Sequence, residues 1–562
     1  MALPHISLIF VCAYISSHEI ITVSSQSIWP EPQQKVIKQD VYVIDSNNFD
    51  FVLGPDSSSG CDVVDLAFKR YRNAIFRKGC PGWRATWRRF LSHTQRRHHR
   101  SNARGGELRL QNLTVYYRRC DAYPENYMDE MYTLSIGSVA RALDLDVNDE
   151  PSYGSSPASL IANSAWGVLR GLETFSQLVY QPSPSSNDFY INGSFVLDFP
   201  RFTFRGVMLD TARHFIPIQI LKQNLDAMVM NKMNVFHWHI VDDQSFPYES
   251  TKFPLLHEKG AYDRETHVYF QREIADVIEY ARLRGIRVIP EFDSPGHTLS
   301  WGNGQKDLLS VCHDDEGRPK DERGPVDPSK ESTFTFLSDF MNEVKDVFPD
   351  RFIHLGGDEV DFTCWLSNPD IQAFMDQMNI TKIEKLEEYY MNRLVEIVGQ
   401  MNKSYIVWQE VLDNNVTLKK DTLINVWKSP VWQDEMAKVT NAGYQAILSS
   451  PWYLNYIHYG IDWQAFYEAE PTKFNGTDLQ KKLVVGGSAC MWSEFVDGSE
   501  IMPRLWPRAS AVAERLWSSK DTTDLDSART RIKHHQCVMQ RRGIRVEPIN
   551  GPGFCPCDQT YV

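Results

Sequence analysis

Two acidic residues, Asp358 and Glu359, stand side by side in the stretch HLGGDEVDFTCW (354–365), directly after a pair of glycines. Neighbouring side chains on a strand point to opposite faces, so both carboxyl groups can serve one cavity only if the strand ends before them. Gly356 and Gly357 permit such a turn, because glycine tolerates backbone conformations that other residues avoid. The pair is therefore either ordinary surface charge or two carboxyl groups turned toward one site.

The chain from about residue 201 alternates between short apolar segments and amphipathic helical segments such as REIADVIEYARLRG. Eight buried strands joined by helices predict an α/β fold, a (β/α)8 barrel over residues 201–562. The predicted strands are 204–210, 234–241, 285–292, 351–357, 405–410, 423–427, 444–450 and 484–492.

Residues 26–200 predict a smaller α+β domain that precedes the barrel. Segment 41–53 alternates like strands, and segment 63–76 has helical spacing. Residues 69–104 contain many Lys, Arg and His and no acid. An exposed loop is the plainer interpretation of that stretch, and a site for an anionic partner or for proteolytic processing is the alternative.

Active-site residues of such barrels lie where the strands end. Polar or large aromatic side chains follow all eight predicted strands: Arg213, Asp242, His297, Asp358 with Glu359, Trp408 with Glu410, Trp427, Tyr453, and Trp492 with Glu494. Singly, each has a plainer interpretation: an ion pair for the arginine, a helix cap for Asp242, a backbone hydrogen bond for His297 and core packing for a tryptophan. Three tryptophans at strand ends favour stacking on a sugar ring.

His237 and His239 lie two residues apart on the second predicted strand, so they face the same way and could bind one metal ion. A metal-dependent amidohydrolase would need this pair near its first strand, with further ligands later in the chain. Packing histidines are the favoured interpretation.

A glycosidase needs a proton donor for the leaving oxygen and a group that stabilises the developing positive charge. Adjacent carboxyl groups are too close in sequence to flank a sugar from opposite faces as acid and nucleophile. They suit a substrate that carries its own nucleophile, a 2-acetamido oxygen that attacks C1 while one carboxylate holds the amide N–H. A non-catalytic glycan-binding barrel is an alternative, but it would be expected to have lost the acid.

Five long segments closely resemble lysosomal β-N-acetylhexosaminidases of glycoside hydrolase family twenty. They are HLGGDEVDFTCW, FRGVMLDTARHF, NVFHWHIVDDQSFPYES, YARLRGIRVIPEFDSPGHTLSW and PRLWPRASAVAERLW, and WGVLRGLETFSQLVY (166–180) extends the resemblance into the N-terminal domain. The resemblance implies an exo-acting, retaining, substrate-assisted enzyme that works through an oxazolinium intermediate, with no cofactor and no metal.

The resemblance also implies roles for individual residues. Glu359 would be the general acid and base, and Asp358 would orient the acetamido N–H and stabilise the positive charge. Tyr453 would hydrogen-bond the acetamido oxygen, Arg213 and Glu494 would bind ring hydroxyls, and Trp408, Trp427 and Trp492 would wall the pocket. Asp242 and His297 would support the acid and the substrate, and Asp293 would support these residues without contacting the substrate.

Disulfides Cys61–Cys120, Cys312–Cys364 and Cys537–Cys555 are implied by the same resemblance, with Cys490 as a buried thiol and Cys80 and Cys557 unassigned. One departure concerns specificity. Asn455 is kept, but Tyr456 stands where the subunit that accepts 6-sulfated sugars has an arginine. Because a guanidinium suits a sulfate, its loss shifts the expectation toward neutral GlcNAc and GalNAc termini.

The apolar run within residues 6–15 predicts a signal peptide over about 1–25, and we find no later run long enough to span a bilayer. Six N-x-S/T triplets support a lumenal or secreted protein, lysosomal by the resemblance: Asn112, Asn192, Asn379, Asn402, Asn415 and Asn475. The net charge of −13 argues against a nucleic-acid partner. Glycans are the expected partners, and family resemblance suggests a dimer.

Overall fold

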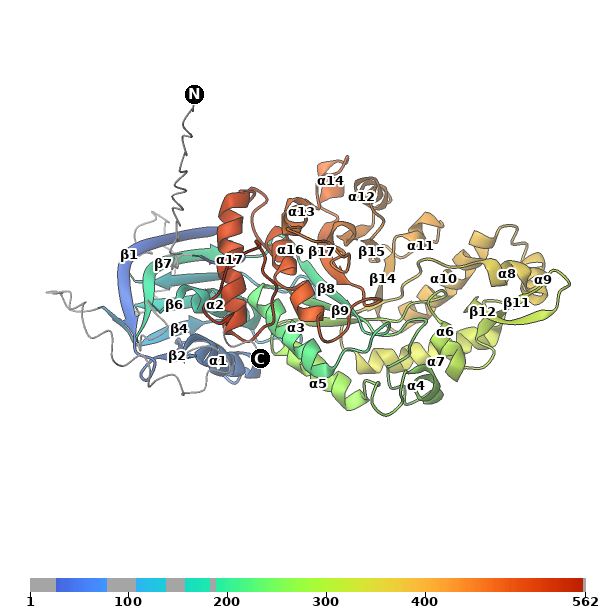
Figure 1. The fold of residues 1–562 in the computed structure, drawn as a ribbon, viewed down its shortest axis with the longest axis horizontal. Helices are drawn as coiled ribbons and strands as arrows, with labels where there is room; N and C mark the ends of the chain where they lie inside the picture. Colours follow the sequence, from blue (N-terminus) through green and yellow to red (C-terminus); the bar gives the residue numbers. More distant parts are fainter. Residues whose placement is uncertain (1–26, 78–107, 138–156, 182–187, 559–562) are drawn as a thin grey trace, which may run out of the picture.

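The computed structural model describes residues 27–77, 108–137, 157–181 and 188–558. The predicted signal peptide, Cys80 and most of the basic stretch 69–104 lie outside these ranges. A seven-stranded sheet occupies one end of the molecule and an eight-stranded barrel the remainder (Figure 1). Among the described helices, none is both long and apolar enough to cross a membrane.

The N-terminal sheet has the strand order β2-β4-β6-β5-β7-β1-β3. Its strands are β1 (Gln34–Ile44), β2 (Asp50–Leu53), β3 (Arg109–Leu110), β4 (Asn112–Tyr116), β5 (Tyr132–Ile136), β6 (Ala158–Ala162) and β7 (Phe189–Asp198). Helices α1 (Asp62–Ile75) and α2 (Ala165–Leu178) pack together, and α2 packs on β5 and β6. Every residue of α2 is buried, because one side of the helix faces the sheet and the other side reaches the barrel.

The barrel consists of eight parallel strands and closes where β17 pairs with β8. The strands are β8 (Phe204–Asp210), β9 (Val235–His239), β10 (Arg287–Glu291), β13 (Phe352–His354), β14 (Ser404–Trp408), β15 (Leu423–Val426), β16 (Gln445–Leu448) and β17 (Val484–Met491). This arrangement confirms the predicted fold class and all eight predicted strands. Seven of the eight end one to three residues earlier than predicted, because the last residues of the predicted segments already belong to the turns that follow the strands.

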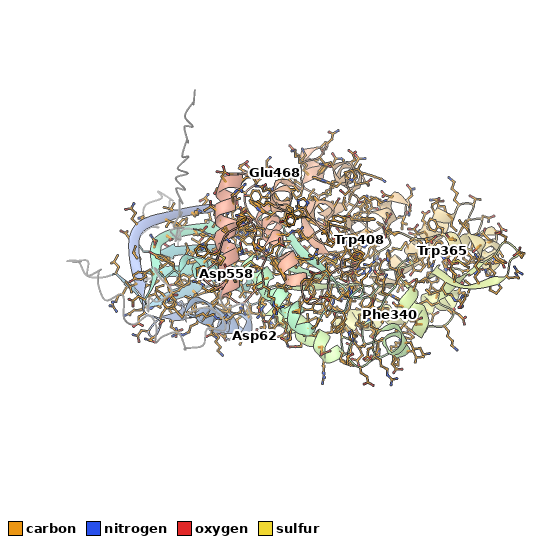
Figure 2. The ribbon with its side chains drawn as sticks, viewed as in Figure 1. Asp62, Phe340, Trp365, Trp408, Glu468 and Asp558 are labelled. Carbon is orange, nitrogen blue, oxygen red and sulfur yellow. A yellow bond between two sulfur atoms is a disulfide. The ribbon has the colours of Figure 1, made fainter. Side chains whose placement is uncertain are left out.

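One apolar side chain from each barrel strand forms a closed layer inside the barrel: Phe204, Val235, Ile289, Phe352, Ile406, Leu423, Ile447 and Val485. Side chains therefore fill the interior. Figure 2 labels Trp408, a fully buried residue, among the densely packed side chains of the molecule. Strand residues two positions further on, such as His237, Glu291 and Trp408, point inward again and are polar or aromatic. The barrel thus has an apolar floor beneath a polar layer.

Helices surround the barrel and one hairpin projects from it. The helices are α3 (Ile218–Met230), α4 (Leu255–Gly260), α5 (Gln271–Arg282), α6 (Leu299–Gly304), α7 (Glu331–Val347), α8 (Thr363–Ser367), α9 (Pro369–Gln377), α10 (Ile383–Gln400), α11 (Glu410–Asp413), α12 (Trp432–Asn441), α13 (Trp463–Glu468), α14 (Asp478–Lys481), α15 (Ile501–Leu505), α16 (Arg508–Trp517) and α17 (Leu525–Arg541), with a short 3-10 turn at Ser450–Trp452. The hairpin β11 (Leu309–His313) and β12 (Pro319–Val326) lies at the end of the molecule opposite the sheet (Figure 1).

Buried charges join the N-terminal sheet to the end of the barrel where its strands begin. Glu130 accepts hydrogen bonds from Arg170 of α2 at 2.8 Å and from Arg205 of β8 at 2.6 Å. Lys232 donates to Asp198 of β7 at 2.6 Å. A buried charge without a partner is costly, so these pairs hold the two parts in one relative position.

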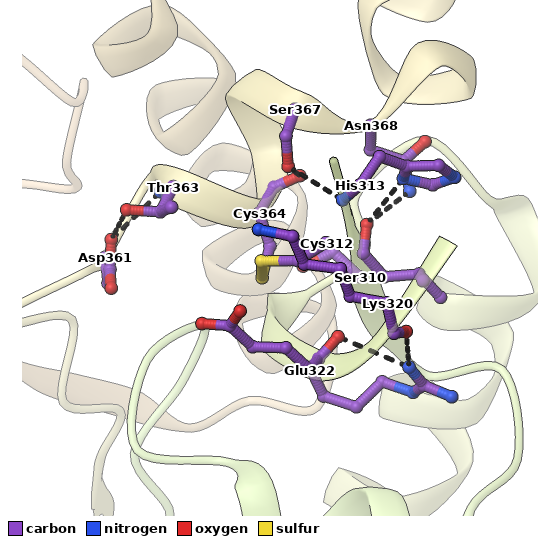
Figure 3. The surroundings of a disulfide bond; sticks show 12 residues. Ser310, Cys312, His313, Lys320, Glu322, Asp361, Thr363, Cys364, Ser367 and Asn368 are labelled. Atoms are coloured by element: carbon purple, nitrogen blue, oxygen red, sulfur yellow. Dashed lines mark hydrogen bonds between the residues drawn. A yellow bond between two sulfur atoms is a disulfide. The ribbon is translucent and has the colours of Figure 1, made fainter. Parts of the chain in front are cut away.

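The structure contains the disulfides Cys61–Cys120, Cys312–Cys364 and Cys537–Cys555, with S–S distances of 2.01, 1.90 and 1.95 Å. Cys557 is also disulfide-bonded, and Cys490 is a buried thiol. Cys312–Cys364 ties β11 to α8, and beside it the hydroxyl of Ser367 accepts the backbone N–H of His313 at 3.1 Å (Figure 3). The loop that follows the two acids is therefore anchored to the projecting hairpin.

The six predicted glycosylation positions differ in accessibility. Asn379, Asn402, Asn415 and Asn475 are exposed, and Asn112 is half-buried. Asn192 is only 8% exposed, and its side-chain amide donates to the carbonyl of Lys38 at 2.9 Å. The structure therefore argues against a glycan on Asn192, because the amide nitrogen that would carry it is buried and bonded within the sheet.

Candidate active site

The chain turns sharply after β13, at the two glycines before the acidic pair. Gly356 and Gly357 have φ values of 68° and 92°, in the region that favours glycine. A Cβ on Gly356 would lie 1.6 Å from Oδ1 of Asp293, so any larger residue would collide with that carboxyl group. The N–H of Gly357 donates to the same Oδ1 at 2.8 Å. The turn thus wraps around Asp293.

Asp358 and Glu359 leave this turn in different environments. Asp358 is 7% exposed, whereas the side chain of Glu359 is 59% exposed. Burial raises the pKa of Asp358 to about 6, partly offset by the nearby charge of His297. Beside it, burial first and then the charge of Asp358 raise the pKa of Asp293 well above its usual range. Of the two acids, Glu359 is the one whose carboxyl group faces solvent, and Asp358 lies deeper in the barrel mouth.

Asp358 and Glu359 both face the same ring nitrogen of His297, so the two adjacent acids serve one site. Nε2 of His297 lies 3.9 Å from Oδ2 of Asp358 and 3.7 Å from Oε2 of Glu359. The other ring nitrogen, Nδ1, donates to Oδ1 of Asp242 at 3.2 Å. Burial alone would lower the pKa of His297, but the hydrogen bond with Asp242 and the charge of Asp358 raise it to about 9. His297 is therefore a cation between Asp242 and the acidic pair.

Asp242 also anchors the arginine that follows β8. Its Oδ2 lies 2.8 Å from Arg213, whose guanidinium also reaches Asp210 at 3.3 Å and lies 5.1 Å from the ring centre of Trp492. Burial would raise the pKa of Asp242, but hydrogen bonds from His239 and His297 and the charge of Arg213 lower it. Arg213 is thereby held at the barrel mouth in a fixed direction.

Aromatic side chains lie on the other side of the same mouth. Trp408 and Trp492 have ring centres 6.1 Å apart, and Tyr453 lies 6.2 Å from Trp492. Trp408 is fully buried, and its indole N–H donates to Glu291 at 2.8 Å. Trp427, whose indole N–H has no hydrogen-bond partner among the described residues, follows β15 next to them in the barrel order.

The structure brings nearly all the predicted site residues together at this end of the barrel. Two of them lie toward the outside: Glu494 is exposed and acts on Arg213 through its charge, and Asn455 is half-buried beside Tyr453. Sequence reasoning missed the roles of Asp210, Glu291 and the carboxylate of Glu410. Glu291 could have been found from the two-residue alternation of its strand, which places it inward with Ile289.

His237 and His239 meet this missed carboxylate. Nε2 of His237 lies 2.7 Å from Oε2 of Glu291, and Nδ1 of His239 lies 2.9 Å from the same oxygen. The other nitrogen of His239 lies 2.7 Å from Asp242. His237, Glu291 and His354 lie close enough to hold an ion geometrically. However, the imidazoles of His237 and His239 already have carboxylate partners, which favours the packing interpretation over a metal pair.

The fold and the site together define a class. A parallel eight-stranded barrel whose C-terminal mouth carries an exposed carboxylic acid, a buried one and a wall of aromatic rings is typical of a glycoside hydrolase.

Comparisons with known proteins agree with this class. Residues 202–520 match the model of the glycosyl hydrolase family 20 catalytic domain, and residues 28–178 match a model described as beta-acetyl hexosaminidase like. The chain belongs to glycosyl hydrolase family 20 and is an enzyme. Human beta-hexosaminidase subunit beta is 46% identical over 535 residues, covering 94% of this chain and 89% of its own length. The rat subunit alpha is also 46% identical, covering 94% and 95%. The crystal structure of Flavobacterium johnsoniae chitobiase superposes with a TM-score of 0.75 at 28% identity, covering 92% of this chain and 73% of its own.

The ion pairs of His239 predict a pH-dependent effect on stability. Burial alone would lower its pKa, but Glu291 and Asp242 raise it to about 10. The folded-state pKa therefore exceeds the unfolded value of about 6.5, so this stabilisation is complete below pH 6.5 and is lost as the pH rises toward 10. His239→Gln should lower the midpoint of thermal unfolding strongly at pH 5.5 and less at pH 9. His267→Gln, at an exposed histidine, serves as the control. An equal loss at both pH values in His239→Gln would contradict the assignment.

Proposed function

We propose that this chain is an exo-acting, retaining β-N-acetylhexosaminidase that removes terminal non-reducing GlcNAc or GalNAc from glycoconjugates. The observation that carries the proposal is the unequal environment of two adjacent carboxyl groups, one exposed and one buried, that face the same imidazole nitrogen. Two such groups on one side of a sugar fit a reaction in which the substrate supplies the nucleophile. They do not fit a pair that must flank the anomeric carbon from opposite faces.

The first half of the reaction forms a cyclic intermediate. The acetamido oxygen of the substrate attacks C1, the bond from C1 to the leaving oxygen breaks, and Glu359 gives its proton to that oxygen. Asp358 accepts a hydrogen bond from the acetamido N–H and stabilises the positive charge that spreads over the oxazolinium ring. Its burial suits this role, because a carboxylate acts more strongly on a nearby cation when water is excluded.

In the second half of the reaction, Glu359 acts as a base. Glu359, now ionised, takes a proton from a water molecule that attacks C1 from the side the leaving group vacated. The oxazolinium ring opens and the product keeps the configuration of the substrate. Nε2 of His297 lies 3.7 Å from Oε2 of Glu359, so the imidazole stands beside the carboxylate that takes this proton.

The remaining site residues hold the sugar. Tyr453 hydrogen-bonds the acetamido oxygen, and Trp408, Trp427 and Trp492 enclose the acetamido group and the ring. Arg213 and Glu494 bind ring hydroxyls at the outer edge, with Asp242 fixing both Arg213 and His297. A pocket closed on one side by buried rings suits removal of one terminal sugar at a time.

Replacing the proton donor tests the proposal directly. Glu359→Gln should lower kcat on N,N′-diacetylchitobiose by about 10²–10⁴-fold, the usual contribution of general acid catalysis. The fold should persist because the side chain is exposed, which circular dichroism and thermal unfolding can check. Asp361→Asn, two residues along the same loop, is the matched control. Near-normal turnover by Glu359→Gln would overturn the assignment.

We further propose that neutral termini are preferred over 6-sulfated ones. Tyr456 is 65% exposed, and its ring centre lies 6.0 Å from that of Tyr453, so an aromatic ring stands where a cation would have to meet a sulfate.

Tyr456→Arg should therefore raise kcat/KM for a 6-sulfated aryl β-N-acetylglucosaminide by about tenfold relative to the unsulfated glycoside, the scale of one charge-assisted hydrogen bond. Tyr127→Arg adds the same charge at the opposite end of the barrel, where Tyr127 contacts Gln445 at the start of β16. A ratio of the two kcat/KM values that rises equally in both variants, or in neither, would contradict the proposal.

We propose that the protein works in the endomembrane lumen, in lysosomes or after secretion. The predicted signal peptide, five accessible sequons and the disulfides support an oxidising compartment.

We also propose a dimer whose interface covers Ile457 and Tyr459, beyond Tyr456. Ile457 is 76% exposed and Tyr459 is fully exposed, and two such large, mostly apolar side chains so close together favour an interaction surface. The double variant Ile457→Ser, Tyr459→Ser should sediment as a monomer where the wild type sediments as a dimer. Leu479→Ser, an equally exposed leucine on α14, should leave the dimer intact. A monomeric wild type, or a dimer unaffected by the double variant, would contradict the proposal.

A further inference from the structure

The backbone that carries the acidic pair is held by side-chain acceptors from three neighbouring barrel strands. The N–H of Gly356 donates to Nδ1 of His354 at 3.1 Å, and the N–H of Gly357 donates to Asp293 at 2.8 Å. The N–H of Glu359 donates to Oε2 of Glu410 at 3.0 Å. His354 belongs to β13, Asp293 follows β10 and Glu410 follows β14, so the strands on either side of β13 contribute to the turn.

Glu359 is the member of this turn that most needs an anchor. Its φ is 49°, a left-handed conformation that residues other than glycine adopt rarely and at an energetic cost. Its side chain is exposed, and its Oε2 lies 3.7 Å from Nε2 of His297, beyond hydrogen-bond distance. The hydrogen bond from its N–H to Glu410 therefore fixes the direction in which its side chain leaves the backbone.

Glu410 is itself fixed by a lysine. Its Oε1 lies 3.2 Å from Nζ of Lys428, which leaves Oε2 for the N–H of Glu359. Nζ of Lys428 also donates to Asp413 at 3.1 Å. Gln409 accepts the backbone N–H of Lys428 at 3.0 Å and so fixes the start of that side chain. Burial would lower the pKa of Lys428, but Glu410 and Asp413 raise it, so the lysine stays charged.

We propose that Glu410 is a positioning residue for the proton donor: its carboxylate, oriented by Lys428, holds Glu359 in the left-handed conformation that aims its carboxyl group at the leaving oxygen. This inference rests on the proposed role of Glu359 as the acid. It gives Glu410 a share in proton transfer that acts through the backbone of Glu359. Glu410 therefore affects the step in which the leaving oxygen takes a proton and leaves binding of the acetamido group unchanged.

Leaving-group dependence separates this role from a merely structural one. A 2,4-dinitrophenolate departs with little help from an acid, whereas the sugar alkoxide released from N,N′-diacetylchitobiose needs a proton. Glu410→Ala should lower kcat on diacetylchitobiose by about tenfold or more, a modest part of the 10²–10⁴-fold contribution of general acid catalysis. On 2,4-dinitrophenyl β-N-acetylglucosaminide kcat should change less than about threefold, because little of that contribution is used there. KM for both substrates should stay near the wild-type value.

Two further variants complete the experiment. Glu410→Gln keeps an amide oxygen that can accept the N–H of Glu359, so it should recover most of the loss on diacetylchitobiose. Asp413→Asn removes the other carboxylate that contacts Lys428 without touching Glu359, so it should leave the ratio of the two kcat values unchanged. Thermal unfolding midpoints check that each variant is folded.

The outcomes that would overturn the inference are specific. Equal losses of kcat on both substrates in Glu410→Ala would assign Glu410 a structural role, and no recovery in Glu410→Gln would contradict the hydrogen bond. If the proposed function itself were wrong, Glu359→Gln would lose the same factor in kcat on both substrates. That result differs from a failure of the inference about Glu410 alone. A selective loss in Glu359→Gln together with none in Glu410→Ala would remove the inference and leave the function standing.

Discussion

The site depends on one close approach, the contact between the carboxyl group of Asp293 and the backbone of Gly356 and Gly357. The 1.6 Å that would separate a Cβ on Gly356 from Oδ1 of Asp293 excludes every other residue at that position. Because the chain folds over this carboxyl group, β13 ends three residues short of its apolar run. Asp358 and Glu359 then leave the strand on one side of the barrel mouth instead of on opposite faces.

The barrel gives these two similar acids different surroundings. Asp358 lies among buried groups and close to Asp293, whereas Glu359 extends toward solvent. Beneath them, the side chain of Glu291 contacts His237, His239 and the indole of Trp408, so one carboxylate fixes both an imidazolium and a wall of the pocket. The apolar layer below this polar layer closes the barrel and keeps its charges in a low-dielectric environment.

Much of the fold could be predicted from the pattern of apolar residues along the chain. All eight barrel strands could be predicted because parallel strands buried on both faces are continuous apolar runs. The strand ends were predicted less accurately. After β13, for example, Gly356 and Gly357 continue the apolar pattern of the sequence but have positive φ values, so the strand ends before them. The buried histidines remained ambiguous for a similar reason: their spacing showed that they face the same way, and only the position of Glu291 opposite them decided what they contact.

By itself the sequence determined the order of the elements, the positions of the strand ends and the types of side chain that gather there, because these follow from local periodicity and from the rule that parallel strands end at one edge. The tertiary structure decided which of those side chains touch. The ion pair between Arg213 and Asp242 joins strands β8 and β9, and the hydrogen bond from Glu359 to Glu410 joins residues 51 apart. Such contacts depend on register and on a few ångströms of backbone direction, which no single segment of the chain specifies.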